Sequence, residues 1–339
     1  MYERENNKRI NKISWKEILL IILFCFYVRS VYYLKKNISI KYDLVIPTNN
    51  INTFLNNKDY FKKFLKYSKI VLISPSSIVL NKTVDDSILF INEDSLIKKQ
   101  KINEFLIKMR SFSTNRDGWY EQQFLKMAYS RICKNEYYLV WDCDTIPIKP
   151  IEMFENGKPI FGMKEEHHIP YFQTINRLFP LLNISNGSYI SEHMIIKTEY
   201  MKNLIEQIEA NTKLSGQTFW EKILMAIDGR NIHLSGFSEY ELYGTYVDNI
   251  YPNYYIKRNW HSVRNAKNWF GSPKNLDQND INWLSQYYYA LTFENFNSFN
   301  GKGLFVVKNK EMQKKYKPNE FFTNYYLNKN NKTQFNQTK

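Results

Sequence analysis

Short apolar strands alternate with amphipathic helices along the first half of the chain, and this alternation constrains the fold more than any other feature. Apolar runs at residues 42–48, 70–74, 87–91 and 137–141 predict buried strands, and apolar residues at helical spacing predict helices between them. Strands that are separated by helices form a parallel sheet with helices on both faces. The sequence therefore predicts an α/β fold around a mixed, mostly parallel central sheet.

Composition divides the chain of 339 residues into three segments. Residues 1–37 are basic and apolar, residues 38–300 carry the alternating pattern, and residues 301–339 are rich in Asn and Lys. A hydrophobic content of 43% over this length can fill one substantial core. We expect one folded domain over residues 38–300 and a C-terminal tail that frays.

The N-terminal segment contains an uninterrupted apolar run at residues 18–28. This run is about half of the ~20 residues that a membrane-spanning helix requires, and Arg29 interrupts its extension. Basic residues flank the run on both sides, so they give it no clear orientation. Trp15, Tyr32 and Tyr33 are typical of a helix in a membrane interface. We expect an apolar helix that lies on or anchors to a membrane; the alternatives are a helix packed on the domain and a single-pass anchor.

The chain is strongly basic, with a net charge of +14 and a pI near 9.3. This charge favours an anionic partner such as nucleic acid, an acidic membrane surface or a phosphorylated small molecule, although an evenly solvated basic surface gives the same total. The three cysteines are widely spaced, so neither a disulfide framework nor a zinc knuckle can be recognised. Cys143 is expected to face the core.

Two aspartates, Asp142 and Asp144, follow the fourth predicted strand directly. Side chains alternate along an extended segment, so both carboxylates are expected on one side and Cys143 on the other. A hard divalent cation such as Mg²⁺ or Mn²⁺ suits such a pair, with phosphate and water as its other ligands. Pro147 is expected to end the strand. The location, at the carboxyl end of a strand in an open sheet, favours ligand binding over the alternative of simple turn residues.

Four blocks of the sequence stand out together: GWYEQQFLKMAY (118–129), YYLVWDCDTIPIKP (137–150), YISEHMIIK (189–197) and FSEYELYGTYV (237–247). In combination they resemble a family of uncharacterised bacterial glycosyltransferases, related to nucleotide-sugar-dependent enzymes with a GT-A fold. The resemblance spans about residues 40–260. It implies a single Rossmann-like GT-A domain in which Asp142 and Asp144 hold a metal ion on the diphosphate of a nucleotide sugar. It also implies that Thr48 lies against the nucleotide and that His261 is a further metal ligand.

A departing nucleoside diphosphate develops negative charge, which a bound metal neutralises. Arg116 and Lys126 are candidates to add positive charge, although Lys126 could equally lie on the solvent side of its helix. Glu192 and His193 interrupt an apolar strand, and the resemblance implies that they border the donor sugar.

Glu239 is the candidate catalytic base. Ser238 and Glu241 have the spacing of a capping box, which gives Glu241 a structural role at a helix start and leaves Glu239 without one. If the enzyme inverts configuration, Glu239 would accept the proton of the acceptor hydroxyl.

Two other functions compete with this interpretation. In a phosphatase of the haloacid dehalogenase type, Asp142 would be the nucleophile and Asp144 the acid/base, but Ile146 departs from that motif and the motif comes late in the chain. In a nucleic-acid-binding protein, the basic and aromatic stretch at residues 254–270 would stack on a single strand. No recognisable binding motif accompanies that stretch.

Together with this resemblance, the sequence predicts a metal-dependent glycosyltransferase that uses Mn²⁺ or Mg²⁺ and a nucleotide sugar. The resemblance alone implies the acceptor, which is a glycan or a lipid-linked glycan in the synthesis of a surface polysaccharide or lipopolysaccharide, and no nucleic acid is expected as a partner. Because bacterial nucleotide sugars are cytosolic, we expect a cytoplasmic protein on the inner face of the membrane.

Overall fold

A mixed five-stranded sheet forms the centre of the folded part of the chain. The computed structural model describes residue 16 and residues 20–27, 40–79, 88–110, 116–294 and 307–324. Within these residues the sheet has the order β3-β2-β1-β4-β8. The strands are β1 (Tyr42–Pro47), β2 (Ile70–Ser74), β3 (Ile88–Asn92), β4 (Tyr137–Trp141) and β8 (His193–Lys197).

The first four strands of this sheet are parallel, and β8 joins β4 in the antiparallel direction. Every residue of β1, β2 and β4 is buried, as expected for strands covered on both faces. The predicted strands agree with the observed ones to within one residue, and the prediction of a mixed α/β fold is confirmed.

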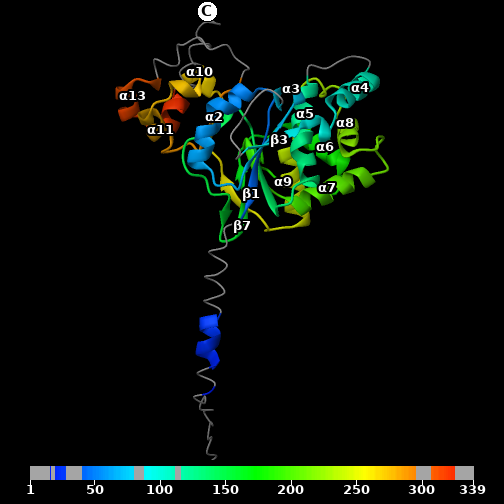
Figure 1. Ribbon diagram of the computed structural model, residues 1–339, viewed down its shortest axis with the longest axis horizontal. Helices are drawn as coiled ribbons and strands as arrows, with labels where there is room; N and C mark the ends of the chain where they lie inside the picture. The colour runs from blue at the N-terminus through cyan, green and yellow to red at the C-terminus, as the bar shows by residue number, and fades with distance from the viewer. Residues whose placement is uncertain are drawn as a thin grey trace, which may run out of the picture. The chain divides into compact units, whose positions relative to one another are not determined.

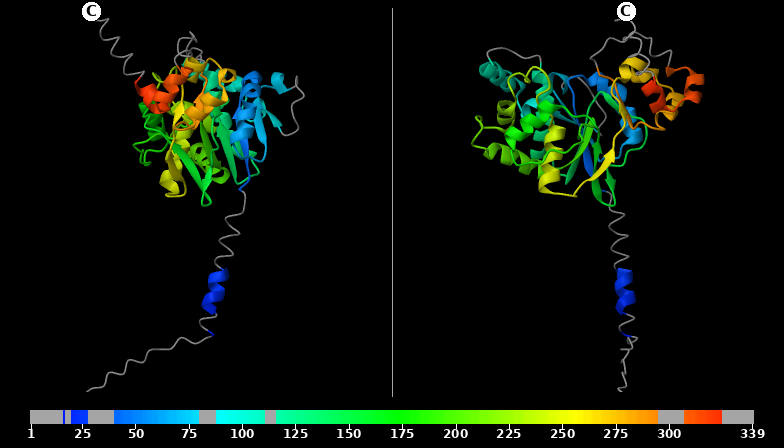
Figure 2. Two further views of the ribbon diagram at one scale, coloured as in Figure 1. Left: turned by 90° about the vertical axis from the view of Figure 1, so that its left-hand side faces the viewer. Right: turned by 180° about the vertical axis from the view of Figure 1, so that it is seen from behind.

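Helices cover both faces of the central sheet (Figure 1). Helix α2 lies on one side and α4 to α9 lie on the other, and the view from behind in Figure 2 shows the same division. The helices are α2 (Ile51–Phe64), α3 (Ser76–Val79), α4 (Lys99–Arg110), α5 (Asp117–Ala128), α6 (Ile169–Leu178), α7 (Thr198–Ala210), α8 (Phe219–Ala226) and α9 (Glu239–Ile250).

Two smaller sheets extend the described part of the domain, with orders β10-β11-β5 and β6-β7-β9. Short helices accompany them and enclose a second hydrophobic cluster, which includes Trp269, Trp283, Phe321 and Phe322. The elements are β5 (Thr145–Pro147), β6 (Phe154–Glu155), β7 (Lys158–Met163), β9 (Ile256–Asn259), β10 (Ser262–Val263), β11 (Ala290–Thr292), α10 (Ala266–Phe270), α11 (Gln278–Leu284) and α13 (Lys310–Lys315).

This second cluster differs from the expectation of a C-terminal tail that frays. Phe321 and Phe322 are only 4% and 5% exposed. Their aromatic rings pack against Trp269 and Trp283. The Asn- and Lys-rich composition did not indicate this packing, because a few buried aromatic residues are enough to hold the segment against the domain.

Helix α5 begins at Asp117, and its N-cap residue is Arg116. Ile132 is 47% exposed, because α5 ends at Ala128 and a 3-10 turn follows. Pro147 is the last residue of the edge strand β5, so a strand ends at this residue as predicted, and the absence of an N–H group is tolerated there.

The N-terminal residues form a separate unit, Met1–Ile40. Residues 20–27 of this unit are helical. In the described residues no helix combines the length and the apolar character needed to cross a membrane.

Candidate active site

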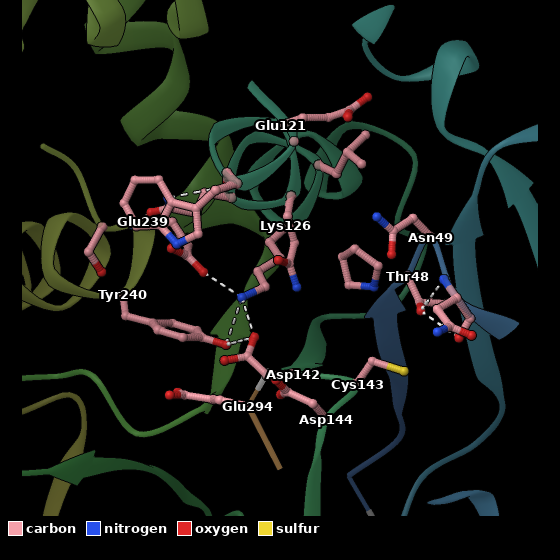
Figure 3. A pocket seen from close by; sticks show the side chains of 18 of the residues that line it. Thr48, Asn49, Glu121, Lys126, Asp142, Cys143, Asp144, Glu239, Tyr240 and Glu294 are labelled. Atoms are coloured by element: carbon pink, nitrogen blue, oxygen red, sulfur yellow. Dashed lines mark hydrogen bonds and ion pairs between the residues drawn. The ribbon is translucent and has the colours of Figure 1, made fainter. Parts of the chain in front are cut away.

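The two aspartates lie in a tight turn between β4 and β5. The Thr145 N–H donates to the Asp142 carbonyl oxygen at 3.0 Å, which closes the turn. The prediction of an extended segment was therefore wrong, although Asp142 and Asp144 still line one cavity and Cys143 is buried with its thiol directed away from them (Figure 3).

Three different elements hold the backbone of this turn. The Asp142 N–H donates to the Glu192 carbonyl at 2.9 Å, and the Phe293 N–H donates to the Asp144 carbonyl at 2.8 Å. The Asn57 side-chain amide donates to the Cys143 carbonyl at 2.8 Å. The turn is thus tied to β8, β11 and α2, and these contacts fix the direction of the carboxylates.

A cavity of about 400 Å³ opens above the turn, at the carboxyl ends of β1 and β4. Ligands bind at this edge of open α/β sheets. The walls come from the end of β1, from α5, from the start of α9 and from the segments around β10 and β11. The residues that line the cavity include Thr48, Trp119, Glu121, Lys126, Asp142, Asp144, Glu239, Tyr240, Arg264 and Glu294.

Lys126 is the centre of the polar network in this cavity. Its Nζ lies 2.5 Å from Asp142 Oδ1, 2.7 Å from Glu239 Oε1 and 3.0 Å from the Tyr240 hydroxyl (Figure 3). Lys126 is only 3% exposed, so its ammonium group is neutralised by protein carboxylates rather than by water. Burial lowers the pKa of Lys126, but Asp142 and Glu239 outweigh burial and hold this pKa well above its usual range.

Helix α9 presents Glu239 and Tyr240 to this lysine. Ser238 caps the helix by accepting the Glu241 N–H at 3.3 Å, so Glu239 becomes the first helical residue and faces inward. Burial raises the pKa of Glu239, while the Lys126 ammonium opposes this rise. Glu241 does not complete the predicted capping box in the described structure, because its carboxylate bonds to the Ser188 hydroxyl instead.

The cavity is acidic although the whole chain is basic. Among the described lining residues, six carboxylates face three cationic side chains, which are Lys99, Lys126 and Arg264. Burial and the neighbouring carboxylates of Asp142 and Glu294 raise the pKa of Asp144 to about 7. Carboxylates that raise each other's pKa in this way form a site that gains stability from a cation.

Asp142 and Asp144 suit a divalent ion only if the ligand supplies part of the coordination. No three His, Cys, Asp or Glu side chains of the described residues converge on a common point for a metal. A carboxylate pair with the remaining positions taken by phosphate and water is the usual arrangement for Mg²⁺. The donor set therefore fits an ion that arrives with a phosphorylated ligand.

Glu192 lies behind the cavity and holds Arg264 in its wall. The Glu192 carboxylate accepts from Trp260 Nε1 at 2.9 Å and from the Ser262 hydroxyl at 3.0 Å, and it pairs with Lys164. Its oxygen Oε1 lies 3.7 Å from Arg264 Nε. Glu192 adopts a left-handed φ of 57°, which is disfavoured for this residue type. Its predicted place beside the donor sugar stays a prediction, since it reaches the cavity through Arg264.

His193 is buried between two tryptophan rings. Its ring centroid lies 5.0 Å from that of Trp141 and 4.1 Å from that of Trp260. The Ser191 carbonyl lies 2.7 Å from His193 Nδ1. Burial lowers the pKa of His193 to about 3, so the ring is neutral. His193 lies outside the set of lining residues.

The other predicted residues occupy different places. Thr48 lines the cavity at the end of β1, and its hydroxyl accepts the Asn50 N–H at 3.1 Å. The guanidinium of Arg116 lies over the ring of Trp119, 5.6 Å from its centroid, and Arg116 is beside the lining residues rather than among them. The structure does not bring His261 to the aspartates: its ring packs against Tyr287 outside the cavity.

Three residues that line the cavity, Tyr240, Arg264 and Glu294, were not predicted from the sequence. Tyr240 directly follows the predicted site residue Glu239, so its position at the start of the same helix could have indicated it. Arg264 lies in the basic stretch that suggested nucleic-acid binding, but its guanidinium pairs with Glu166 at 2.9 Å and Glu294 at 3.3 Å. Glu294 follows a strand of three residues, and no pattern points to it.

The chain is similar to solved structures and matches one family model. The apo crystal structure of mouse xyloside xylosyltransferase 1 is similar over 66% of this chain and 88% of that chain, with 11% sequence identity and a TM-score of 0.35. No curated protein matches the chain. A family model described as a family of unknown function, DUF6492, matches residues 31–320. The match covers most of the chain, and the protein therefore belongs to this family of unknown function.

Proposed function

We propose that this protein is a metal-dependent glycosyltransferase that transfers a sugar from a nucleotide sugar to a hydroxyl group of a glycan or lipid-linked glycan. The observation that carries this proposal is the convergence of Asp142, Asp144 and Glu239 on one cavity at the carboxyl edge of the sheet. Two acidic groups suit a cation and a diphosphate, and the third is placed to accept a proton. A role in surface polysaccharide or lipopolysaccharide synthesis, on the cytoplasmic side, is part of the proposal.

Asp142 and Asp144 would hold the divalent ion. When bound, the ion supplies Lewis acidity that neutralises the charge developing on the departing diphosphate. Arg264 adds a fixed positive charge to the same wall, and its pairing with Glu166, Glu192 and Glu294 holds the guanidinium in place.

Glu239 would act as the general base. The acceptor oxygen bonds to the anomeric carbon while the bond between that carbon and the nucleoside diphosphate breaks, and the hydroxyl proton moves to the Glu239 carboxylate. Lys126 holds Glu239 Oε1 at 2.7 Å and balances its charge, so the second oxygen is the one available to the proton. Burial of Glu239, which raises its pKa, strengthens it as a base.

The test is the release of nucleoside diphosphate from a panel of nucleotide sugars in the presence of Mn²⁺. Glu239→Gln should lower turnover by about 100-fold or more, the usual contribution of a general base. Glu241→Gln is the matched control, because Glu241 lies two residues away on the same helix, bonds to Ser188 and does not line the cavity. Equal loss in both variants, or no turnover of any nucleotide sugar by the wild type, would contradict the proposal.

The structure weakens the nucleic-acid-binding alternative. The aromatic side chains of Trp260, Trp269 and Phe270 are at most 4% exposed, so they cannot provide a stacking surface for single-stranded nucleic acid.

A further inference from the structure

The two candidate metal ligands differ in their electrostatic partners. Asp142 Oδ1 accepts a hydrogen bond from Lys126 Nζ at 2.5 Å and another from the Tyr240 hydroxyl at 3.2 Å (Figure 3). Asp144 instead faces the carboxylates of Asp142 and Glu294. The positive charge of Lys126 is therefore placed on one ligand of the pair, although the cavity is acidic on the whole.

Lys126 has further partners that are not candidate metal ligands. An ammonium group carries three N–H donors, and those of Lys126 reach Asp142, Glu239 and the Tyr240 hydroxyl, the last two at 2.7 and 3.0 Å. If the bond to Asp142 is lost, the buried ammonium still has the Glu239 carboxylate as its counter-charge. Lys126 can therefore release Asp142 without becoming a buried charge that has no partner.

A divalent ion at the aspartates competes with this ammonium group. Two hydrogen bonds already occupy Asp142 Oδ1, so an ion that uses this oxygen has to displace Lys126. An ion on the other oxygen of Asp142 meets a like charge on the same carboxylate. For comparison, a charge within 4–6 Å changes the affinity of a carboxylate for a proton by about 10- to 1000-fold. A divalent ion, with its larger charge, should lose at least about 10-fold.

A diphosphate at the site would lower this penalty. It brings negative charge next to both cations, so the ion and the ammonium group no longer share one carboxylate. Because linkage is reciprocal, the diphosphate tightens the binding of the ion by the same factor as the ion tightens that of the diphosphate. An ion that enters with a phosphorylated ligand is thus favoured over an ion that enters alone.

We propose that Lys126 is an internal counter-cation that competes with the divalent ion for Asp142 and weakens the binding of the free ion. Lys126 acts through Asp142, so it is a positioning residue in this respect. The identity of the phosphorylated ligand rests on the proposed function. The competition with the ion does not, because it is measured with the metal alone.

The test is calorimetric titration of Mn²⁺ into the full chain and into Lys126→Met, without nucleotide. Lys126→Met should bind Mn²⁺ at least about 10-fold more tightly than the wild type. The matched control is Lys222→Met, because Lys222 is similarly buried, donates to the backbone carbonyls of Glu209 and Asn211 and lies outside the cavity. This control should leave the affinity for Mn²⁺ within about twofold.

A second pair of variants gives the same comparison without leaving Glu239 as an unpaired charge. Lys126→Met/Glu239→Gln should bind Mn²⁺ at least about 10-fold more tightly than Glu239→Gln alone. Circular dichroism of each variant confirms that it is folded. If loss of Lys126 leaves the affinity for Mn²⁺ unchanged or lowers it in both pairs, the proposal is overturned, because Lys126 would then only hold Asp142 in place. An equal gain in Lys222→Met would also overturn it, since the effect would follow net charge alone.

Titrations with UDP and GDP separate this inference from the proposed function. If one of them binds, it should tighten the binding of Mn²⁺ by a larger factor in the wild type than in Lys126→Met, which has no ammonium group to compensate. An equal factor in the two proteins would contradict the competition. Tighter binding of Mn²⁺ by Lys126→Met, together with no binding of either nucleotide, would support the competition and count against the glycosyltransferase proposal.

Discussion

A single buried lysine organises the candidate active site. Lys126 contacts Asp142, Glu239 and Tyr240, which come from the turn after β4 and from the start of α9. The sequence could not distinguish this position from a solvent-exposed one, because its neighbours on the helix are mixed. The partners that decide its burial are 16 and 113 residues away along the chain.

Removal of this ammonium group should destabilise the protein. Lys126→Met leaves Asp142 and Glu239 without their cation, and a buried pair broken in this way costs about 3–5 kcal/mol. Urea unfolding should show this loss, and adding Glu239→Gln to the variant should recover part of it. The control is Lys314→Met, which removes a lysine that is 74% exposed and should cost less than about 1 kcal/mol. Similar costs for the two lysines would contradict the role of Lys126.

His193 should make stability depend on pH. Because burial lowers its pKa to about 3 from an ordinary 6.5, the folded state favours the neutral ring. This contribution to the free energy of unfolding is fully present above pH 6.5 and is lost as pH falls toward 3. Between pH 6.5 and 4.5 the wild type should lose about 2 to 3 kcal/mol more than His193→Gln, measured by urea unfolding. A difference between the two proteins that does not change with pH would contradict this account, because it would show that folding does not change the pKa of His193.

At the scale of elements, the start of α9 depends on close packing along the rest of that helix. Glycine 244 lies in α9 where the ring of Tyr189 crosses it, and a Cβ there would come within 2.2 Å of that ring. Tyr189 is fully buried, and its hydroxyl donates to Asp248, so it cannot move away easily. This contact fixes α9 against the segment that leads into β8.

Gly244→Ala should therefore be destabilising, although alanine normally stabilises a helix by about 1 kcal/mol relative to glycine. Overpacking of this kind costs about 1–3 kcal/mol, which should appear as a lower midpoint in thermal or urea unfolding. Gly118→Ala in α5 is the comparison, because a Cβ there meets only the end of Lys99 at 3.5 Å. Gly244→Ala with wild-type stability would contradict the packing described here.

The elements were more predictable than the site. Strands β1, β2 and β4 are short, mostly apolar segments bounded by polar residues, so local sequence defines them. The site depends on contacts between distant segments. Asp142 could be recognised because it follows a buried strand, whereas Arg264 and Glu294 reach the cavity only through the pairing of β10, β11 and β5. The alternation argument placed the two aspartates together and the Cys143 thiol away from them, as observed, but a turn rather than an extended strand carries these residues.

At the scale of the whole molecule, the folded unit has a central sheet and a second hydrophobic cluster that the C-terminal segment completes. Phe321→Ala should lower the free energy of unfolding by about 3–5 kcal/mol, because this ring is 4% exposed and packs on Trp269 and Trp283. Chemical unfolding of the variant provides the measurement. A change near zero would mean that residues 307–324 do not pack as described.

The most direct test of the central claim is calorimetric titration of UDP, GDP and CMP into the wild type, with and without Mn²⁺. The acidic cavity predicts that one of these nucleotides binds only with Mn²⁺, that Asp144→Asn abolishes this binding, and that Asp228→Asn, which removes a carboxylate outside the cavity, leaves it intact. If none of the nucleotides binds in either condition, and Asp144→Asn leaves the affinity for Mn²⁺ unchanged, the aspartates are turn residues and the glycosyltransferase proposal is wrong.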